Sequence, residues 1–156
     1  YFNDEGIILE ADPQNIDHFQ NILTFDEKGL LIERKIVKSN GHIHELYRYH
    51  GKDTLLSIDQ FQNNELLFKT LYTYTASGKL SKYEKKSASG ELVDKKEYRF
   101  LDGKIISETR TSPGIKHETK YEYDSDVLIK EERWTNQRKK NTTIFTYNSE
   151  KQKIKE

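Results

Sequence analysis

Residues 91–100 read Glu-Leu-Val-Asp-Lys-Lys-Glu-Tyr-Arg-Phe, and Asp102-Gly103 follows one residue later. Along this stretch the side chains alternate, and side chains of a β-strand point in turn to the two faces of a sheet. Asp-Gly suits the tight turn of a β-hairpin, because glycine adopts a positive φ without steric cost. The stretch therefore predicts a strand that places Tyr98 and Phe100 on one face and leads into a hairpin turn.

The same arrangement repeats along the chain every 23 to 26 residues. The aromatic residue before the turn recurs as Phe2, Phe25, Tyr49, Tyr74, Phe100, Tyr123 and Tyr147. A second large residue stands two positions earlier, as Leu23, Tyr47, Tyr72, Tyr98, Tyr121 and Phe145. Twelve of the 18 aromatic residues occupy these two columns, so the repeat is not a chance pattern. Two strands of about eight residues and two turns account for the period.

Turn sequences separate the expected strands at both ends of each hairpin. The first turns are Asp4-Glu5-Gly6, Asp26-Glu27-Lys28-Gly29, Ala76-Ser77-Gly78, Asp102-Gly103 and Asp124-Ser125-Asp126. The second turns are Asp12-Pro13, Ser39-Asn40-Gly41, Gln62-Asn63-Asn64, Ser87-Ala88-Ser89-Gly90, Ser112-Pro113-Gly114 and Thr135-Asn136-Gln137. We therefore predict an all-β fold, a repetitive antiparallel β-hairpin meander of about seven units in one open, twisted sheet.

The composition permits such a sheet but allows only a thin core. Leu, Ile, Val and Phe make up 38 of 156 residues, just above the share of about 20% below which highly charged chains stay disordered. Zero net charge favours folding, and the absence of cysteine excludes disulfides, a thiol nucleophile and cysteine-based metal sites. No segment approaches the about 18 apolar residues of a transmembrane helix, so none is expected.

The repeat register runs through the whole sequence without a linker. We expect residues 1–156 to form one repeat array. Tyr1-Phe2 begins at the end of a strand, and Lys151–Glu156 covers only part of a returning one. The chain is therefore expected to be cut within a repeat at both ends, as an ordered piece of something longer.

The aromatic–turn–leucine unit resembles the YD-repeat (Rhs-type) family, whose pattern is Tyr-x-Tyr-Asp-x-x-Gly-x-Leu. The best match is Tyr121-Glu-Tyr-Asp-Ser-Asp-Val-Leu128. Residues 72–80 fit apart from the Asp, and residues 23–31 fit apart from the first Tyr, with Phe25 in place of the second. The resemblance implies spiralling β-sheet in secreted or bacterial surface proteins, hence a cell-surface or periplasmic location. A weaker similarity is to MORN-type hairpin repeats, which contain far more glycine than the eight residues present here.

The residues give little support for catalysis or metal binding. No Gly-x-Ser-x-Gly motif or cysteine is present, and no pair of carboxylates stands out. His42-Ile43-His44 places two imidazoles on one strand face with His50 nearby, but His42 adjoins an exposed turn. The repeated turn aspartates lack the dense spacing of a calcium loop and are expected to cap turns. We expect no catalytic residue, no metal, no cofactor and no enzyme activity.

The charge is unevenly distributed along the neutral chain. Residues 1–78 carry 7 basic and 12 acidic side chains, whereas residues 79–156 carry 19 and 14, so the net charges of the two halves are −5 and +5. Arg138, Lys139 and Lys140 form a basic turn close to Trp134. Such a patch beside an aromatic ring can bind nucleic acid, but acidic residues interleave and the chain is neutral. We therefore expect no nucleic-acid partner.

Six of the 18 aromatic residues lie outside the repeat columns, and Tyr83 and Trp134 are the two among them that we single out. The columns themselves are expected to pack the sheet, because few other apolar residues can do so. Our candidate binding residues are therefore Tyr83, Trp134, Arg138, Lys139 and Lys140. The leading hypothesis is a non-catalytic recognition or scaffold module that binds another protein, an envelope component by the resemblance. The alternative is a carbohydrate-binding module whose exposed aromatic rings stack on a glycan.

Overall fold

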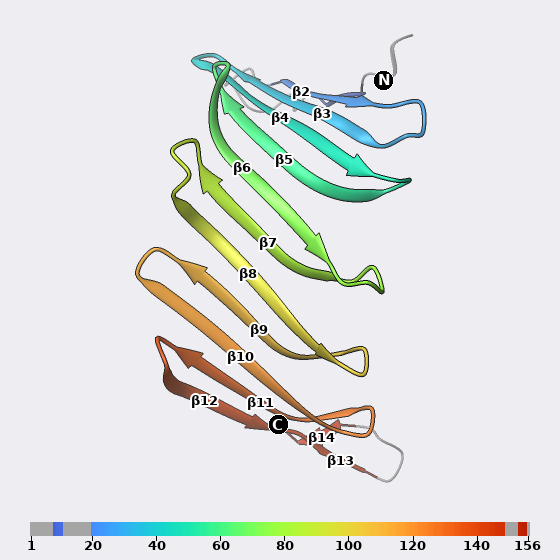
Figure 1. The fold of residues 1–156 in the computed structure, drawn as a ribbon, viewed down its shortest axis with the longest axis vertical. Coiled ribbons are helices and arrows are strands. Elements are labelled where there is room, and N and C mark those ends of the chain that lie inside the picture. The colour runs from blue at the N-terminus through green and yellow to red at the C-terminus, as the bar shows by residue number, and fades with distance from the viewer. Residues whose placement is uncertain (1–7, 11–19, 149–152, 156) are drawn as a thin grey trace. The chain divides into compact units, whose positions relative to one another are not determined.

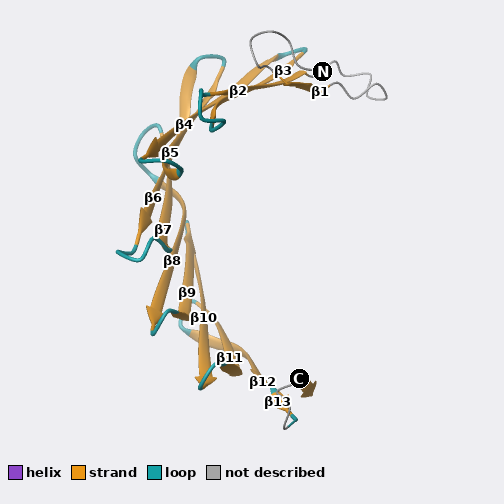
Figure 2. Ribbon diagram, turned by 90° about the vertical axis from the view of Figure 1, so that its right-hand side faces the viewer, coloured by secondary structure: helices purple, strands orange, loops and turns teal. Residues whose placement is uncertain are grey.

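The computed structural model describes residues 8–10, 20–148 and 153–155, which contain strands and turns and no helix (Figure 2). No helix that could span a membrane is thus present in these ranges. The strands are β1 (Ile8–Glu10), β2 (Gln20–Phe25), β3 (Leu31–Lys38), β4 (Gly41–His50), β5 (Thr54–Gln62), β6 (Glu65–Tyr74), β7 (Leu80–Ser87), β8 (Leu92–Leu101), β9 (Lys104–Ser112), β10 (Ile115–Asp124), β11 (Val127–Thr135), β12 (Arg138–Ile144), β13 (Thr146–Tyr147) and β14 (Lys153–Lys155).

The strands pair in the order in which they occur in the chain (Figure 1). Each strand from β2 to β11 lies between its two sequence neighbours, β12 ends this sheet, and β13 pairs with β14 separately. Because β1 and β12 are not neighbours, the sheet is open. The structure thereby confirms the predicted all-β, antiparallel hairpin meander.

The described strands belong to two compact units, which we treat separately. The first unit comprises Tyr1–Tyr72 and Lys85–Glu91, and the second comprises Thr73–Glu84 and Leu92–Glu156. That residues 1–156 form one array stays a prediction. Its two ends, with Phe2 and the turns expected at residues 4–6 and 12–13, lie outside the described residues.

The turns form where the sequence places them between residues 26 and 137, and one more occurs at residues 51–53. The Asp26 carboxylate accepts hydrogen bonds from the backbone N–H groups of Lys28 and Leu30, both at 2.9 Å. The expected capping role is confirmed for this aspartate. Gly29, at φ 79°, completes the same turn in a conformation that a side chain would strain.

The two aromatic columns lie on one face of each unit, which we call the aromatic face. Tyr47 and Tyr49 are half-buried while Arg48 between them is exposed, and Tyr98, Arg99 and Phe100 repeat this pattern. Strand alternation places Arg48 and Arg99 on the other side, the arginine face of their respective units. The columns therefore pack the sheet, as the sequence predicts.

A β-bulge accompanies the second aromatic column in each hairpin whose register is defined. Opposite Arg48 and Tyr49, for example, the partners are Ser57 and Leu55, which leaves Leu56 as the extra residue. The extra residues in the four hairpins are all aliphatic: Ile32, Leu56, Ile106 and Ile129. A bulge strengthens the local twist and redirects the strand. In these four hairpins the bulge therefore places a bend at the same position of the repeat, which alternation alone does not predict.

Column tyrosines also bind the hairpin that precedes them. The hydroxyl of Tyr49 donates to the carbonyl oxygen of Leu31 at 2.9 Å, and that of Tyr123 donates to Ile105 at 3.1 Å. Tyr147 donates in the same way to Leu128 at 2.8 Å. Each bond spans 18 or 19 residues and links the return strand of one hairpin to the next repeat. We call this contact the tyrosine latch.

The described residues contain no buried large apolar side chain. Only three residues in this part of the chain are buried and polar, Ser57, Asp59 and Ser107, and all lie on the arginine face. Within each unit the strands lie side by side in one layer (Figure 1). Packing therefore rests on half-buried aromatic side chains and on backbone hydrogen bonds between strands.

Candidate binding surfaces

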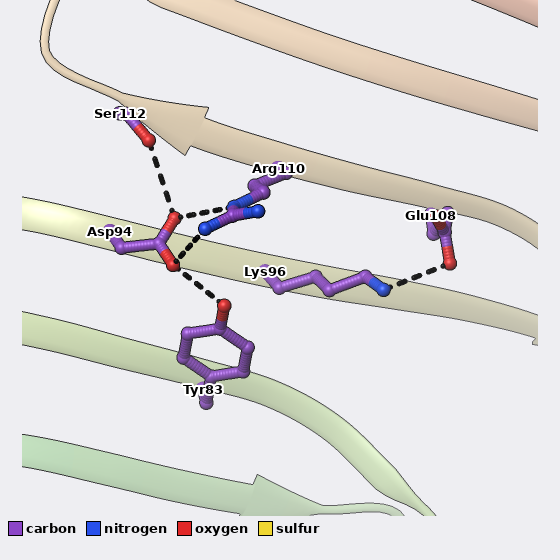
Figure 3. Close-up of polar contacts among 6 residues, drawn as sticks. All are labelled: Tyr83, Asp94, Lys96, Glu108, Arg110 and Ser112. Atoms are coloured by element: carbon purple, nitrogen blue, oxygen red, sulfur yellow. Dashed lines mark hydrogen bonds and ion pairs between the residues drawn. The ribbon is translucent and has the colours of Figure 1, made fainter.

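A polar cluster on the aromatic face of the second unit contains Tyr83, the first candidate binding residue (Figure 3). Three neighbouring strands bring its members together around the carboxylate of Asp94. Tyr83 on β7 donates its hydroxyl to Oδ2 at 2.7 Å. Arg110 on β9 donates Nε to Oδ1 at 3.0 Å and Nη2 to Oδ2 at 3.1 Å, and Ser112 donates Oγ to Oδ1 at 3.3 Å. The structure thus gives Tyr83 an intramolecular hydrogen-bond partner.

The electrostatics of this cluster follow from the shared carboxylate. The hydrogen bond from Arg110, aided by the one from Tyr83, holds the pKa of Asp94 below its ordinary value despite partial burial. Burial, together with the hydrogen bond to Asp94, raises the pKa of Tyr83. Asp94 is therefore ionised and Tyr83 neutral at neutral pH, and the cluster is held in one charge state. A satisfied network of this kind stabilises the sheet.

Trp134 on β11 is the second candidate, and it belongs to the arginine face. Its ring is half-buried. The Nζ atom of Lys120 lies 4.9 Å from the ring centroid, and that of Lys139 lies 5.3 Å from it. Lys139 also pairs with Glu132 at 2.7 Å. Arg138 and Lys140 at the adjoining turn are exposed, as expected of a basic hairpin tip. Two lysines thus occupy positions over the ring that a stacking ligand would need.

Tyr83 and Trp134 lie on opposite faces of the second unit. Trp134 pairs with Glu118, Glu118 with Thr109, and Thr109 with Glu97, so these four share the arginine face. Asp94 lies three residues before Glu97 on β8 and therefore points to the other face, where it binds Tyr83. The two candidate aromatics consequently belong to two separate surfaces.

His42 and His44, the two histidines on one strand face, each have a polar side chain close to Nε2. His42 Nε2 lies 3.0 Å from the side-chain oxygen of Asn64, and His44 Nε2 lies 2.9 Å from a carboxylate oxygen of Glu33. His50, at the end of β4, is exposed. In the described ranges no three metal-binding side chains come together.

The two units differ in how an equivalent arginine side chain is paired. In the first unit Arg48 pairs across the strands with Ser57, and its guanidinium contacts the carboxylate of Asp59 at 2.5 Å. In the second unit Arg99 pairs with Ser107 in the same register, and Thr109 stands where Asp59 stands in the first. Ser57 and Ser107 are equally buried, at 5% and 7% exposure, so the two sites share one backbone framework.

Arg99 borders a shallow hollow of about 410 Å³ within the second unit. The hollow is lined by Thr73, Ser81, Lys82, Glu97, Tyr98, Arg99 and Thr109. Glu97 pairs with Lys95 at 2.8 Å and Lys82 with Glu84 at 3.3 Å. The side chain of Arg99 is exposed and makes neither a hydrogen bond nor an ion pair with any residue that the structure describes.

Sequence alone contains part of this signal. Aligning the repeats places Arg48 and Arg99 at the same position between the aromatic columns. The difference between Asp59 and Thr109 acquires meaning only from the strand register, which shows that each faces its arginine diagonally across the hairpin.

The fold and these surfaces define an open β-hairpin repeat protein with two chemically distinct faces. A family model described as "Uncharacterised protein" matches residues 20–118, and the chain belongs to this family. No curated protein matches the chain. Among solved structures, "Crystal Structure of TarM" is 11% identical, with a TM-score of 0.25 over 68% of this chain and 21% of that chain. The alignment thus spans about a fifth of the TarM chain.

Proposed function

We propose that this protein is a non-catalytic recognition module that binds another protein through its arginine face. The observation that carries the proposal is the position of the large apolar side chains that are most exposed among the described residues. Ile144, Leu101 and Leu71 are 63%, 60% and 43% exposed, and strand register or alternation places each on the arginine face of its unit. A protein partner that covers these side chains would remove apolar surface from water, which favours association.

The aromatic face is less suited to a partner. Its column rings are half-buried, and the hydroxyls of Tyr49 and Tyr123 donate hydrogen bonds to backbone carbonyls. Tyr83 is bound to Asp94. The rings and hydroxyls that a ligand on this face would have to contact are therefore already packed or hydrogen-bonded within the protein.

The edge of the sheet at β12 is also a poor docking site. Arg138, Lys139 and Lys140 on this strand are exposed, and charged residues on an edge strand oppose the addition of another strand. These charged side chains therefore favour a face of the sheet, and not this edge, as the binding surface. The resemblance to surface repeat proteins supports an envelope or secreted location, which we include in the proposal.

The proposal is tested by capture of partners from the native envelope fraction with the tagged protein, read by mass spectrometry. Leu101→Glu introduces a charge at the exposed arginine face, and Ile115→Glu is the matched control, since Ile115 is 39% exposed on the aromatic face. Circular dichroism verifies that all three baits are folded. We expect one stoichiometric protein that Leu101→Glu loses and Ile115→Glu retains.

Two results would contradict this function. Capture of no protein by the folded wild-type bait would remove the protein-recognition hypothesis, and binding to a glycan array would then establish the carbohydrate alternative. Equal capture by all three baits would show that the arginine face is not the interface.

A further inference from the structure

The arginine faces of the two units contain one site with an internal carboxylate and one without. Arg48 and Arg99 occupy equivalent positions, each opposite a buried serine. Asp59 neutralises Arg48 within the sheet, whereas Thr109 occupies the corresponding position beside Arg99. The first site is therefore a working example, in the same protein, of what the second site can bind.

We propose that the hollow beside Arg99 binds a carboxylate side chain of the protein partner. This inference rests on the proposed function and specifies the chemistry of its interface. A guanidinium binds a carboxylate through two parallel N–H···O hydrogen bonds, and Arg99 has no internal partner among the described residues. The partner's carboxylate takes the place that Asp59 has beside Arg48.

The residues around Arg99 favour a peptide over an acidic sugar. Leu101 follows two residues later on the same face and is 60% exposed, so an apolar side chain next to the carboxylate has a contact. The hollow offers Thr73, Ser81 and Thr109 as polar neighbours. The ring of Tyr98 belongs to the aromatic face by alternation, so no aromatic ring in the lining presents itself for sugar stacking.

Charge in the hollow selects a single carboxylate rather than a polyanion. Glu97 borders the same hollow and repels a second negative charge, although Lys95 partly neutralises it. Ser81 donates its hydroxyl to the carbonyl oxygen of Thr73 at 3.0 Å, which leaves the oxygen of Ser81 as an acceptor. The peptide expected to bind thus has one acidic residue followed by an apolar one.

The experiment uses NMR titration of the ¹⁵N-labelled protein at low salt with N-acetyl-Glu-Leu-amide. N-acetyl-Gln-Leu-amide is the uncharged control peptide and glucuronate is the acidic-sugar probe. We expect saturable shifts of the Arg99 side-chain Nε–H signal and of the amides around Thr109 with the Glu peptide alone. The corresponding Arg48 signal serves as an internal control, because Asp59 already occupies its guanidinium.

Variants at position 109 separate charge from shape. Thr109→Asp supplies the carboxylate internally, as in the first unit, and is expected to weaken peptide binding at least about fivefold while the protein stays folded. Thr109→Asn has nearly the same shape without the charge and is expected to bind as the wild type does. Arg99→Gln is expected to abolish the shifts.

The outcomes separate this inference from the proposed function. Absence of an Arg99 shift, equal shifts with the Gln peptide, or equal binding by Thr109→Asp would overturn the inference. A response to glucuronate but not to the Glu peptide would show that the carboxylate bound at Arg99 belongs to an acidic sugar and not to a peptide. If Thr109→Asp still captures the native partner as the wild type does, the inference fails and the recognition function stands. Peptide shifts at Arg99 that Thr109→Asp loses support the inference even when envelope capture fails.

Discussion

The hydrogen bond between Tyr83 and Asp94 is expected to stabilise the second unit by about 1 kcal/mol. Hydrogen bonds to charged groups contribute about 1.5–3 kcal/mol, and partial solvent exposure reduces this value. The hydroxyl–carboxylate distance of 2.7 Å places the bond among the stronger ones in the sheet. Tyr83→Phe removes the donor and retains the ring, so it isolates this bond from packing.

The assay is a double-mutant cycle of Tyr83→Phe and Asp94→Asn, with the free energy of unfolding taken from urea denaturation followed by circular dichroism. We expect each single variant to be less stable and the coupling energy to be about 1 kcal/mol. Asp94→Asn is expected to be the more destabilising single change, because it also weakens the two contacts of Arg110. Purely additive effects, or an unchanged stability of Tyr83→Phe, would refute the reasoning.

The pH dependence of the same bond provides a second check. The pKa of Asp94 is lowered in the folded protein from an ordinary value of 3.8, so its contribution is complete above that pH. As the pH falls below 3.8 through the folded-state pKa, the carboxylate is protonated and the contribution is lost. The difference in stability between wild type and Asp94→Asn should therefore narrow in this acid range, and a constant difference would contradict the assignment.

Three further changes test other parts of the fold. Tyr49→Phe breaks one tyrosine latch and should lower the free energy of unfolding by about 1 kcal/mol in urea denaturation. An unchanged free energy of unfolding would show that the latch does not stabilise the fold. Gly41→Ala should lower the melting temperature, because φ is 141° and a Cβ atom would collide with the side chain of Asn63; an unchanged melting temperature would argue against this packing. Burial and the hydrogen bond to Glu45 raise the pKa of Tyr47 to about 12, so stability should fall between pH 10 and 12, and Tyr47→Phe should flatten that decline.

Local chemistry explains what the sequence predicts correctly. Alternation, turn residues and the aromatic columns depend on neighbours within a few residues. They identify the strands, most turns and the residues of the aromatic face. Asp26 caps its turn as expected because the bonds it makes reach only Lys28 and Leu30. The turn at residues 51–53 is not among the predicted turns, although Gly51 and Asp53 are residue types that also mark other turns of the chain.

Long-range register accounts for what the sequence does not predict. Tyr83 lies outside the repeat columns and suggests a free ring, but its hydroxyl reaches Asp94, eleven residues later on the next strand. The face that Trp134 occupies follows from a chain of three strand pairings. The contrast between Arg48 and Arg99 depends on which residue lies diagonally opposite, and a one-residue shift of the hairpin would abolish it.

The tyrosine latch has a consequence for how such an array can grow in evolution. Each latch needs only a tyrosine and a carbonyl oxygen of the hairpin immediately before it, 18 or 19 residues upstream. Tandem duplication of one 24-residue segment would therefore supply both the new tyrosine and its acceptor, and every older bond would be preserved. A repeat unit added in this way would bring its own latch, whereas a residue inserted within one of the paired strands would shift the tyrosine out of register with its acceptor.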